Sequence, residues 1–116
     1  NPDRCRALDC LQVIGSFEEA LADWHTLNGG DGIAVLTGAR HSDGIDYPEA
    51  KQLAKQQPVL LVFGTGHGLA AELYKAERPC LAPVRAGRYN HLSVRTAAAV
   101  VLDRLLGEQG ELPRLI

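Results

Sequence analysis

The chain has 116 residues, which suits one domain, and 46% of them are hydrophobic, which is enough for a modest core. Its formal net charge of −2 argues against a surface that coats nucleic acid or a membrane through charge alone. No apolar run approaches the roughly 20 residues of a membrane span, so we expect a cytoplasmic protein without membrane partners. Cys5, Cys10 and Cys80 lack the spacing of a metal or redox site, so we expect reduced thiols and no metal.

Strand-like and helix-like segments alternate along the chain. Four apolar runs predict strands at residues 11–15, 32–38, 59–63 and 80–84. Helices are expected after them at residues 17–27, 48–57, 69–76 and 92–107. Ser16 and Glu19 form a capping box for the first helix, and Pro48 suits the first turn of the second. Because the strands are continuous apolar runs, we expect a single α/β domain over residues 1–116, with a parallel sheet covered by helices on both faces.

The turn between residues 63 and 69 is rich in glycine. Gly64, Gly66 and Gly68 alternate there, between a strand and a helix. Bare backbone at such a turn lets a ligand approach closely, and the N–H groups that open a helix favour an anionic or polar group. The spacing differs from the dinucleotide fingerprint GxGxxG, and a tight turn without any ligand remains an alternative.

The last predicted helix carries one apolar stripe and a run of small residues. Its stripe is expected to be buried and comprises Val94, Ala97, Ala98, Val101, Leu102 and Leu105. The run of alanines over residues 97–99 removes bulk, so something should pack very close to the first turns of this helix. Asn90 and Ser93 can each cap it.

Three segments, "LLVFGTGHGL", "LAPV" and "YNHLSVRTAAAVVLDRL", together resemble one known family over residues 59–106. The pattern is similar to the C-terminal half of SPOUT-class RNA methyltransferases, especially those related to tRNA guanine-N1 methyltransferase. The resemblance implies a SPOUT-like fold with a C-terminal trefoil knot, and transfer of a methyl group from S-adenosylmethionine to a tRNA or rRNA nucleotide. It also implies a homodimer built through the knot region.

In that family three loops hold the cofactor, largely through backbone groups. Carried over, the cofactor-binding residues are Leu36, Thr37, Gly38, Gly64, Thr65, Gly66, Gly68, Pro83, Val84, Asn90, His91, Leu92 and Val94. The catalytic base is not identified by the resemblance, and Arg40 and His91 are candidates. His67 could line the pocket, or it could be only an exposed side chain of the turn.

Arginines gather near the third of these loops. From Arg78 to Leu102, both included, the chain has four arginines and no acidic residue, which hints at a phosphate-bearing partner or at a solvated surface. We expect Arg85, Arg88 and Arg95 to contact the RNA substrate.

Two departures from the family pattern are expected from the resemblance. Ser93 stands where many relatives have asparagine, and we expect the chain to begin after an earlier strand–helix section that carries catalytic groups, which would make the fold truncated. An alternative function is therefore a non-catalytic dimerisation or RNA-binding appendage of a larger methyltransferase. A Rossmann-type dinucleotide enzyme is a weaker alternative, because the first predicted strand leads into Gly15-Ser16-Phe17 and not into GxGxxG.

Overall fold

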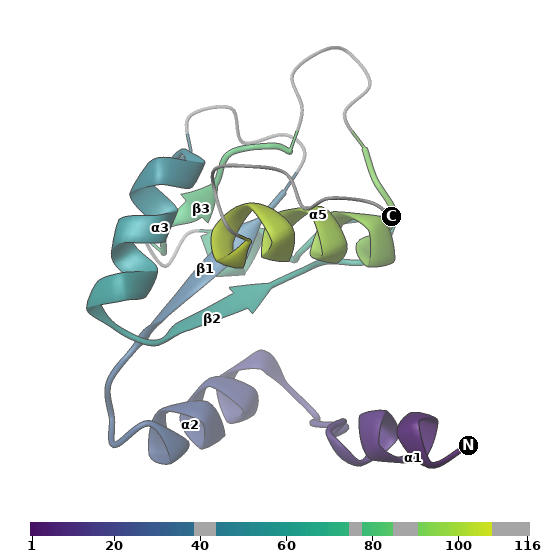
Figure 1. Ribbon diagram of the computed structural model, residues 1–116. Helices are drawn as coiled ribbons and strands as arrows, with labels where there is room; N and C mark the ends of the chain where they lie inside the picture. The colour runs from purple at the N-terminus through teal and green to yellow at the C-terminus, as the bar shows by residue number, and fades with distance from the viewer. Residues whose placement is uncertain (39–43, 75–77, 85–90, 108–116) are drawn as a thin grey trace. The chain divides into compact units, whose positions relative to one another are not determined.

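Figure 1 shows the computed structural model of the chain, which describes residues 1–38, 44–74, 78–84 and 91–107. The chain divides into two compact units, Asn1–Asp31 and Gly32–Ile116, and each unit is considered by itself. The expectation that residues 1–116 form a single domain stays a prediction.

The first unit begins with helix α1 (Pro2–Asp9). The side chain of Asn1 accepts hydrogen bonds from the backbone N–H groups of Asp3 and Arg4, at 2.9 and 3.3 Å. Pro2 occupies the first turn, where no backbone donor is required. This helix is absent from the sequence-based expectations, although Asn1 and Pro2 carry its start signal.

The second helix of this unit, α2 (Phe17–Leu27), confirms the helix predicted over these residues. The hydroxyl group of Ser16 accepts a hydrogen bond of 3.2 Å from the backbone N–H of Glu19, as the capping box predicts. The helix ends at Leu27 with Asn28 as its C-cap, and Gly29 follows in the left-handed region at φ 65°.

The strand predicted at residues 11–15 is wrong. Residues 11–14 form neither helix nor strand, and Leu11 and Val13 are 69% and 104% exposed. An apolar run favours a strand only when a neighbouring strand pairs with it, and a sequence pattern does not report that partner.

The second unit contains a parallel sheet, as predicted. Its strands are β1 (Ile33–Thr37), β2 (Val59–Val62) and β3 (Cys80–Leu81), and they lie in the order β2-β1-β3. Ile33 pairs with Val59, and Leu36 pairs with Cys80 on the other side of the same strand. Four strands were expected from the apolar runs, whereas the described residues form three, because the run before α2 does not pair. The helices of this unit are α3 (Tyr47–Gln56), α4 (Ala71–Tyr74) and α5 (Val94–Leu106).

One hydrophobic cluster of the second unit lies on a single face of the sheet. Val35 of β1 and Leu81 of β3 are each 1% exposed and pack in one cluster with Ala50 of α3 and Val101 of α5. Helices α3 and α5 therefore cover the same face of the sheet (Figure 1). Helices on the opposite face, the knot and the truncation of the fold stay predictions.

The apolar stripe predicted for α5 is partly correct. Val101 is buried, and Ala97, Ala98 and Leu105 are half-buried. Val94 and Leu102 are 43% and 44% exposed, so the expectation that they are buried is wrong. Leu102 lies about 100° around the helix from Val101, and Val94 is the first residue of the helix, where fewer neighbours surround it.

Candidate functional site

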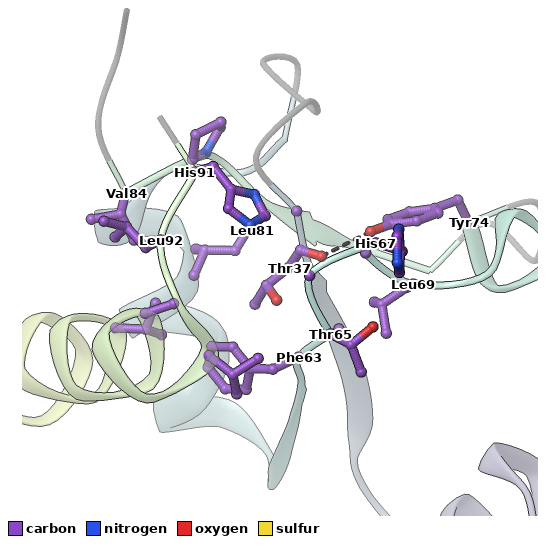
Figure 2. Close-up of a pocket in the computed structure, with 18 of the residues that line it drawn as sticks. Thr37, Phe63, Thr65, His67, Leu69, Tyr74, Leu81, Val84, His91 and Leu92 are labelled. Atoms are coloured by element: carbon purple, nitrogen blue, oxygen red, sulfur yellow. Dashed lines mark hydrogen bonds between the residues drawn. The ribbon is translucent and has the colours of Figure 1, made fainter. Parts of the chain in front are cut away.

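A pocket of about 610 Å³ lies at the carboxyl ends of the three parallel strands. Thr37 ends β1, Phe63 and Gly64 follow β2, and Ala82 follows β3, so three segments far apart in the sequence meet at this edge. Crevices beyond the carboxyl ends of parallel strands are common ligand sites, and this volume lies within the range of small-molecule pockets. Figure 2 shows the side chains that surround the pocket.

The glycine-rich turn forms one wall of this pocket. The backbone N–H of Gly68, which has a φ of 78°, donates a 2.8 Å hydrogen bond to the carbonyl oxygen of Thr65. A Cβ atom on Gly64 would lie 2.5 Å from the carbonyl carbon of Gly68 and 2.7 Å from the backbone nitrogen of Leu69. The close approach of backbone within the turn therefore requires glycine at position 64, and the positive φ favours it at position 68.

Gly66 differs from these two glycines. A Cβ atom at this position would meet no heavy atom within 4 Å, and its φ is not in the left-handed region. Neither packing nor backbone conformation therefore demands a glycine at position 66. Its missing side chain leaves bare backbone on the pocket wall, which is what a ligand held through main-chain groups requires.

The end of β1 is held by two hydrogen bonds. Thr37 donates from its hydroxyl group to the carbonyl oxygen of Val62 at 2.8 Å. Its own carbonyl accepts a hydrogen bond, also of 2.8 Å, from the hydroxyl group of Tyr74, which Figure 2 draws as a dashed line. Burial raises the pKa of Tyr74 above its ordinary value of 10.0, and the nearby Cys80 raises it further. The hydroxyl group of Tyr74 therefore remains protonated, and able to donate, at neutral pH.

The loop that follows β3 forms a third wall of the pocket, and a side chain that does not line the pocket holds it in place. Arg104 of α5 donates from Nη1 to the carbonyl oxygen of Val84 at 2.6 Å. Its guanidinium carbon also lies 5.0 Å from the centre of the Tyr47 ring, a cation–π distance. One side chain thus connects α5, the start of α3 and the loop that follows β3.

Two histidines lie at the pocket. His67 on the glycine-rich turn and His91 before α5 are both exposed and both line the pocket, on different sides of it in Figure 2. An imidazole can accept a proton from a substrate held between such walls. The structure thus places His67 at the pocket.

Most of the residues expected at a cofactor site come together in this one pocket. Those that line it are Thr37, Gly38, Gly64, Thr65, Gly66, Gly68, Pro83, Val84, His91, Leu92 and Val94. Leu36 does not line it, because successive side chains of a strand point to opposite faces and Leu36 lies next to Thr37, which lines the pocket. Arg95 is exposed in the first turn of α5, and Arg40, Arg85, Arg88 and Asn90 lie outside the described residues.

Several other pocket residues have no place in the predicted set. They are Phe63, Leu69, Ala71, Tyr74, Leu81, Ala82, Ala97 and Val101. The run of alanines gave a signal for Ala97, whose small side chain leaves room at the pocket wall. No sequence pattern indicates Tyr74, because its partner lies 37 residues earlier in the chain.

Comparison with known proteins identifies the family. The model of a family described as SAM-dependent RNA methyltransferase matches residues 1–107. The chain therefore belongs to this family of RNA methyltransferases, and the resemblance found in its motifs is confirmed.

Individual relatives agree with this assignment. Over 109 residues, which are 93% of the chain, it is 39% identical to a tRNA (guanine-N(1)-)-methyltransferase of Oleidesulfovibrio alaskensis and 40% identical to the one of Nitratidesulfovibrio vulgaris. It is also 33% identical to an uncharacterized protein of Aquifex aeolicus, of which it covers 53%. The chain spans 26% of the length of the two tRNA methyltransferases. None of the helices in the described ranges is long and apolar enough to cross a membrane.

Proposed function

We propose that this chain provides the S-adenosylmethionine site of an enzyme that methylates RNA, with a tRNA nucleotide as the substrate. Family membership and the names of the two tRNA methyltransferase relatives support this function. The observation that carries it is the bare backbone at Gly66, which the fold itself does not require and which faces a pocket of suitable size. The proposal includes a cytoplasmic location, because the proposed substrate is tRNA.

The residues of the pocket fit S-adenosylmethionine. Phe63 and Leu69 offer apolar surface for an adenine ring, and the turn from Gly64 to Gly68 offers backbone groups to polar parts of the cofactor. When bound, the cofactor supplies a methyl group activated by a positively charged sulfur. The pocket walls would orient that methyl group and limit the access of water.

A ring nitrogen that carries a proton, such as N1 of guanine, must lose that proton when it is methylated. His91 is our candidate to accept it, because its exposed imidazole lines the pocket on the segment that leads into α5. Arg40 stays a second candidate, although it lies outside the described residues.

The RNA would approach along the arginines near the third loop. Arg95 is exposed and directly follows Val94, which lines the pocket. Arg85 and Arg88 follow Val84, another lining residue, in the sequence. We propose that these three arginines hold RNA phosphates next to the methyl donor.

A homodimer through the knot region and α5 also belongs to this proposal. Leu102 and Leu106 are 44% and 74% exposed on α5, and Ala99 is exposed near them. Their burial against a second copy would remove apolar surface from water.

A non-catalytic dimerisation or RNA-binding role within a larger methyltransferase is the second candidate, since the segment that the chain matches makes up 26% of each tRNA methyltransferase relative. Incubation of the 116-residue chain with tRNA and S-adenosylmethionine carrying a labelled methyl group separates the two functions. A methyltransferase transfers the label to tRNA, whereas an appendage binds RNA or forms dimers without any transfer. Transfer by wild type and none by His91→Ala, with unchanged cofactor binding, would support His91 as the base.

A further inference from the structure

A second hollow lies outside the cofactor pocket, between α3 and α5. It encloses about 550 Å³, and its lining residues are Tyr47, Pro48, Lys51, Gln52, Lys55 and Arg104. None of these residues lines the first pocket. We call this hollow the α3–α5 groove.

The groove is positively charged. Lys51 and Lys55 lie one helical turn apart on α3, and Arg104 lines the groove from α5. No acidic residue lines the groove in the part of the chain that the structure describes. Within the described ranges the lysines form no ion pair, and the two contacts found for Arg104 are to the neutral Val84 carbonyl and the Tyr47 ring. Like charges four residues apart on a helix destabilise it. An anion bound between these side chains would remove that repulsion.

We propose that the α3–α5 groove binds phosphates of the RNA backbone, as a second contact surface beside the arginines near the cofactor pocket. This inference rests on the proposed function, because it takes RNA as the substrate. The lysines provide flexible point charges for phosphate oxygens. The guanidinium group of Arg104 has five N–H donors, and its described hydrogen bond to Val84 uses one of them.

Arg104 also links the groove to the cofactor pocket. Its hydrogen-bond acceptor, the carbonyl group of Val84, belongs to a residue that lines the pocket. A phosphate held by Arg104 in the groove would therefore bias the position of the loop that follows β3. RNA bound there and the cofactor should then affect one another's affinity by the same factor.

The test replaces the two lysines and follows tRNA binding as salt is increased. Lys51→Gln with Lys55→Gln removes two positive charges at exposed or half-buried positions on α3. The matched control, Arg4→Gln with Arg6→Gln, removes two charges from exposed positions on α1. Each lost phosphate contact lowers the slope of log affinity against log salt by about one unit. We expect a slope lower by about two in the lysine variant, weaker binding at low salt, and little change in the control.

Three outcomes would overturn the proposal. Equal salt slopes in wild type and the lysine variant would show that the groove does not bind RNA. An equal loss of tRNA affinity in the arginine control would show a general effect of net charge. Polyglutamate that binds as tightly as tRNA and depends equally on the lysines would assign the groove to an acidic protein.

The experiment also separates failure of this inference from failure of the proposed function. If wild type binds tRNA and the lysine variant binds it equally well, only the inference fails. If wild type binds no tRNA even at low salt, both fail, and titration with S-adenosylmethionine still reports the cofactor site by itself. Arg104→Lys, which keeps the charge and changes the geometry of the donor, should weaken cofactor and tRNA binding together if the groove and the pocket are linked.

Discussion

The hydroxyl group of Tyr74 donates a 2.8 Å hydrogen bond to the backbone carbonyl of Thr37, which lies 37 residues earlier in the chain. Tyr74 ends the short helix that follows the glycine-rich turn, and Thr37 ends the central strand of the sheet. Both residues line the pocket. This bond therefore fixes two of the three pocket walls relative to one another.

Replacement of Tyr74 by phenylalanine should lower both stability and affinity for the cofactor. The variant loses one partly buried hydrogen bond, which contributes about 1 kcal/mol to the free energy of unfolding. Tyr47→Phe is the matched control, since the Tyr47 hydroxyl is buried and has no hydrogen-bond partner among the described residues. Denaturant unfolding should show a loss for Tyr74→Phe and no loss for Tyr47→Phe. Equal losses in both variants would contradict this account of the Tyr74 bond.

The raised pKa of Tyr74 predicts a dependence of stability on alkaline pH. The hydroxyl group has a higher pKa in the folded protein than its value of 10.0 in the unfolded chain, first because of burial and second because of Cys80. Its contribution to stability is therefore complete below pH 10.0 and is lost as the pH rises through the folded pKa. Unfolding measured across this range should show a steeper alkaline loss in wild type than in Tyr74→Phe. If the stability of wild type and of Tyr74→Phe falls equally with rising pH, the Tyr74 hydroxyl group does not cause the alkaline loss.

Replacement of the arginines near the third loop should weaken RNA binding without changing the affinity for the cofactor. We expect Arg85→Ala with Arg88→Ala to weaken tRNA binding and to lower the salt slope by about one unit for each contact. Affinity for S-adenosylmethionine should change little. If these arginines only solubilise the surface, wild type and the double variant will bind tRNA equally at low salt, and the appendage function gains support.

Association through α5 can be measured by sedimentation. We expect a dimer at micromolar concentration, and we expect Leu106→Asp to shift it toward monomer, because Leu106 is 74% exposed and a charge there would be costly to bury. An Arg6→Gln variant, with a change on the exposed face of α1, provides the control. Wild type that sediments only as a monomer would count against the dimer.

Local signals explain which parts of the fold could be predicted. Continuous apolar runs predicted β1 and β2 within a residue or two, and Ser16 and Pro48 predicted where α2 and α3 begin. The apolar run at residues 11–15 led to a wrong prediction of a strand, because strand formation depends on a pairing partner that the sequence pattern does not contain.

The site was predictable where it depends on short motifs. The glycine-rich turn and the segment from His91 to Val94 were recognised from their sequence, and the structure brings both to one pocket. The bonds from Tyr74 to Thr37 and from Arg104 to Val84 join residues 37 and 20 positions apart, so only the folded chain reveals them.

The most direct test of the central claim is calorimetric titration of S-adenosylmethionine into wild type and into Gly66→Val. A side chain at Gly66 has no protein atom within 4 Å of its Cβ, so the variant should fold normally and fill space that the cofactor needs. Gly64→Ala is the control for folding, because its Cβ would press on Gly68 at 2.5 Å and should lower stability by about 1–3 kcal/mol. We predict saturable binding to wild type, none to the folded Gly66→Val variant, and no binding of NAD to either. Equal affinity of wild type and Gly66→Val for S-adenosylmethionine, or binding of NAD in its place, would contradict the proposed site.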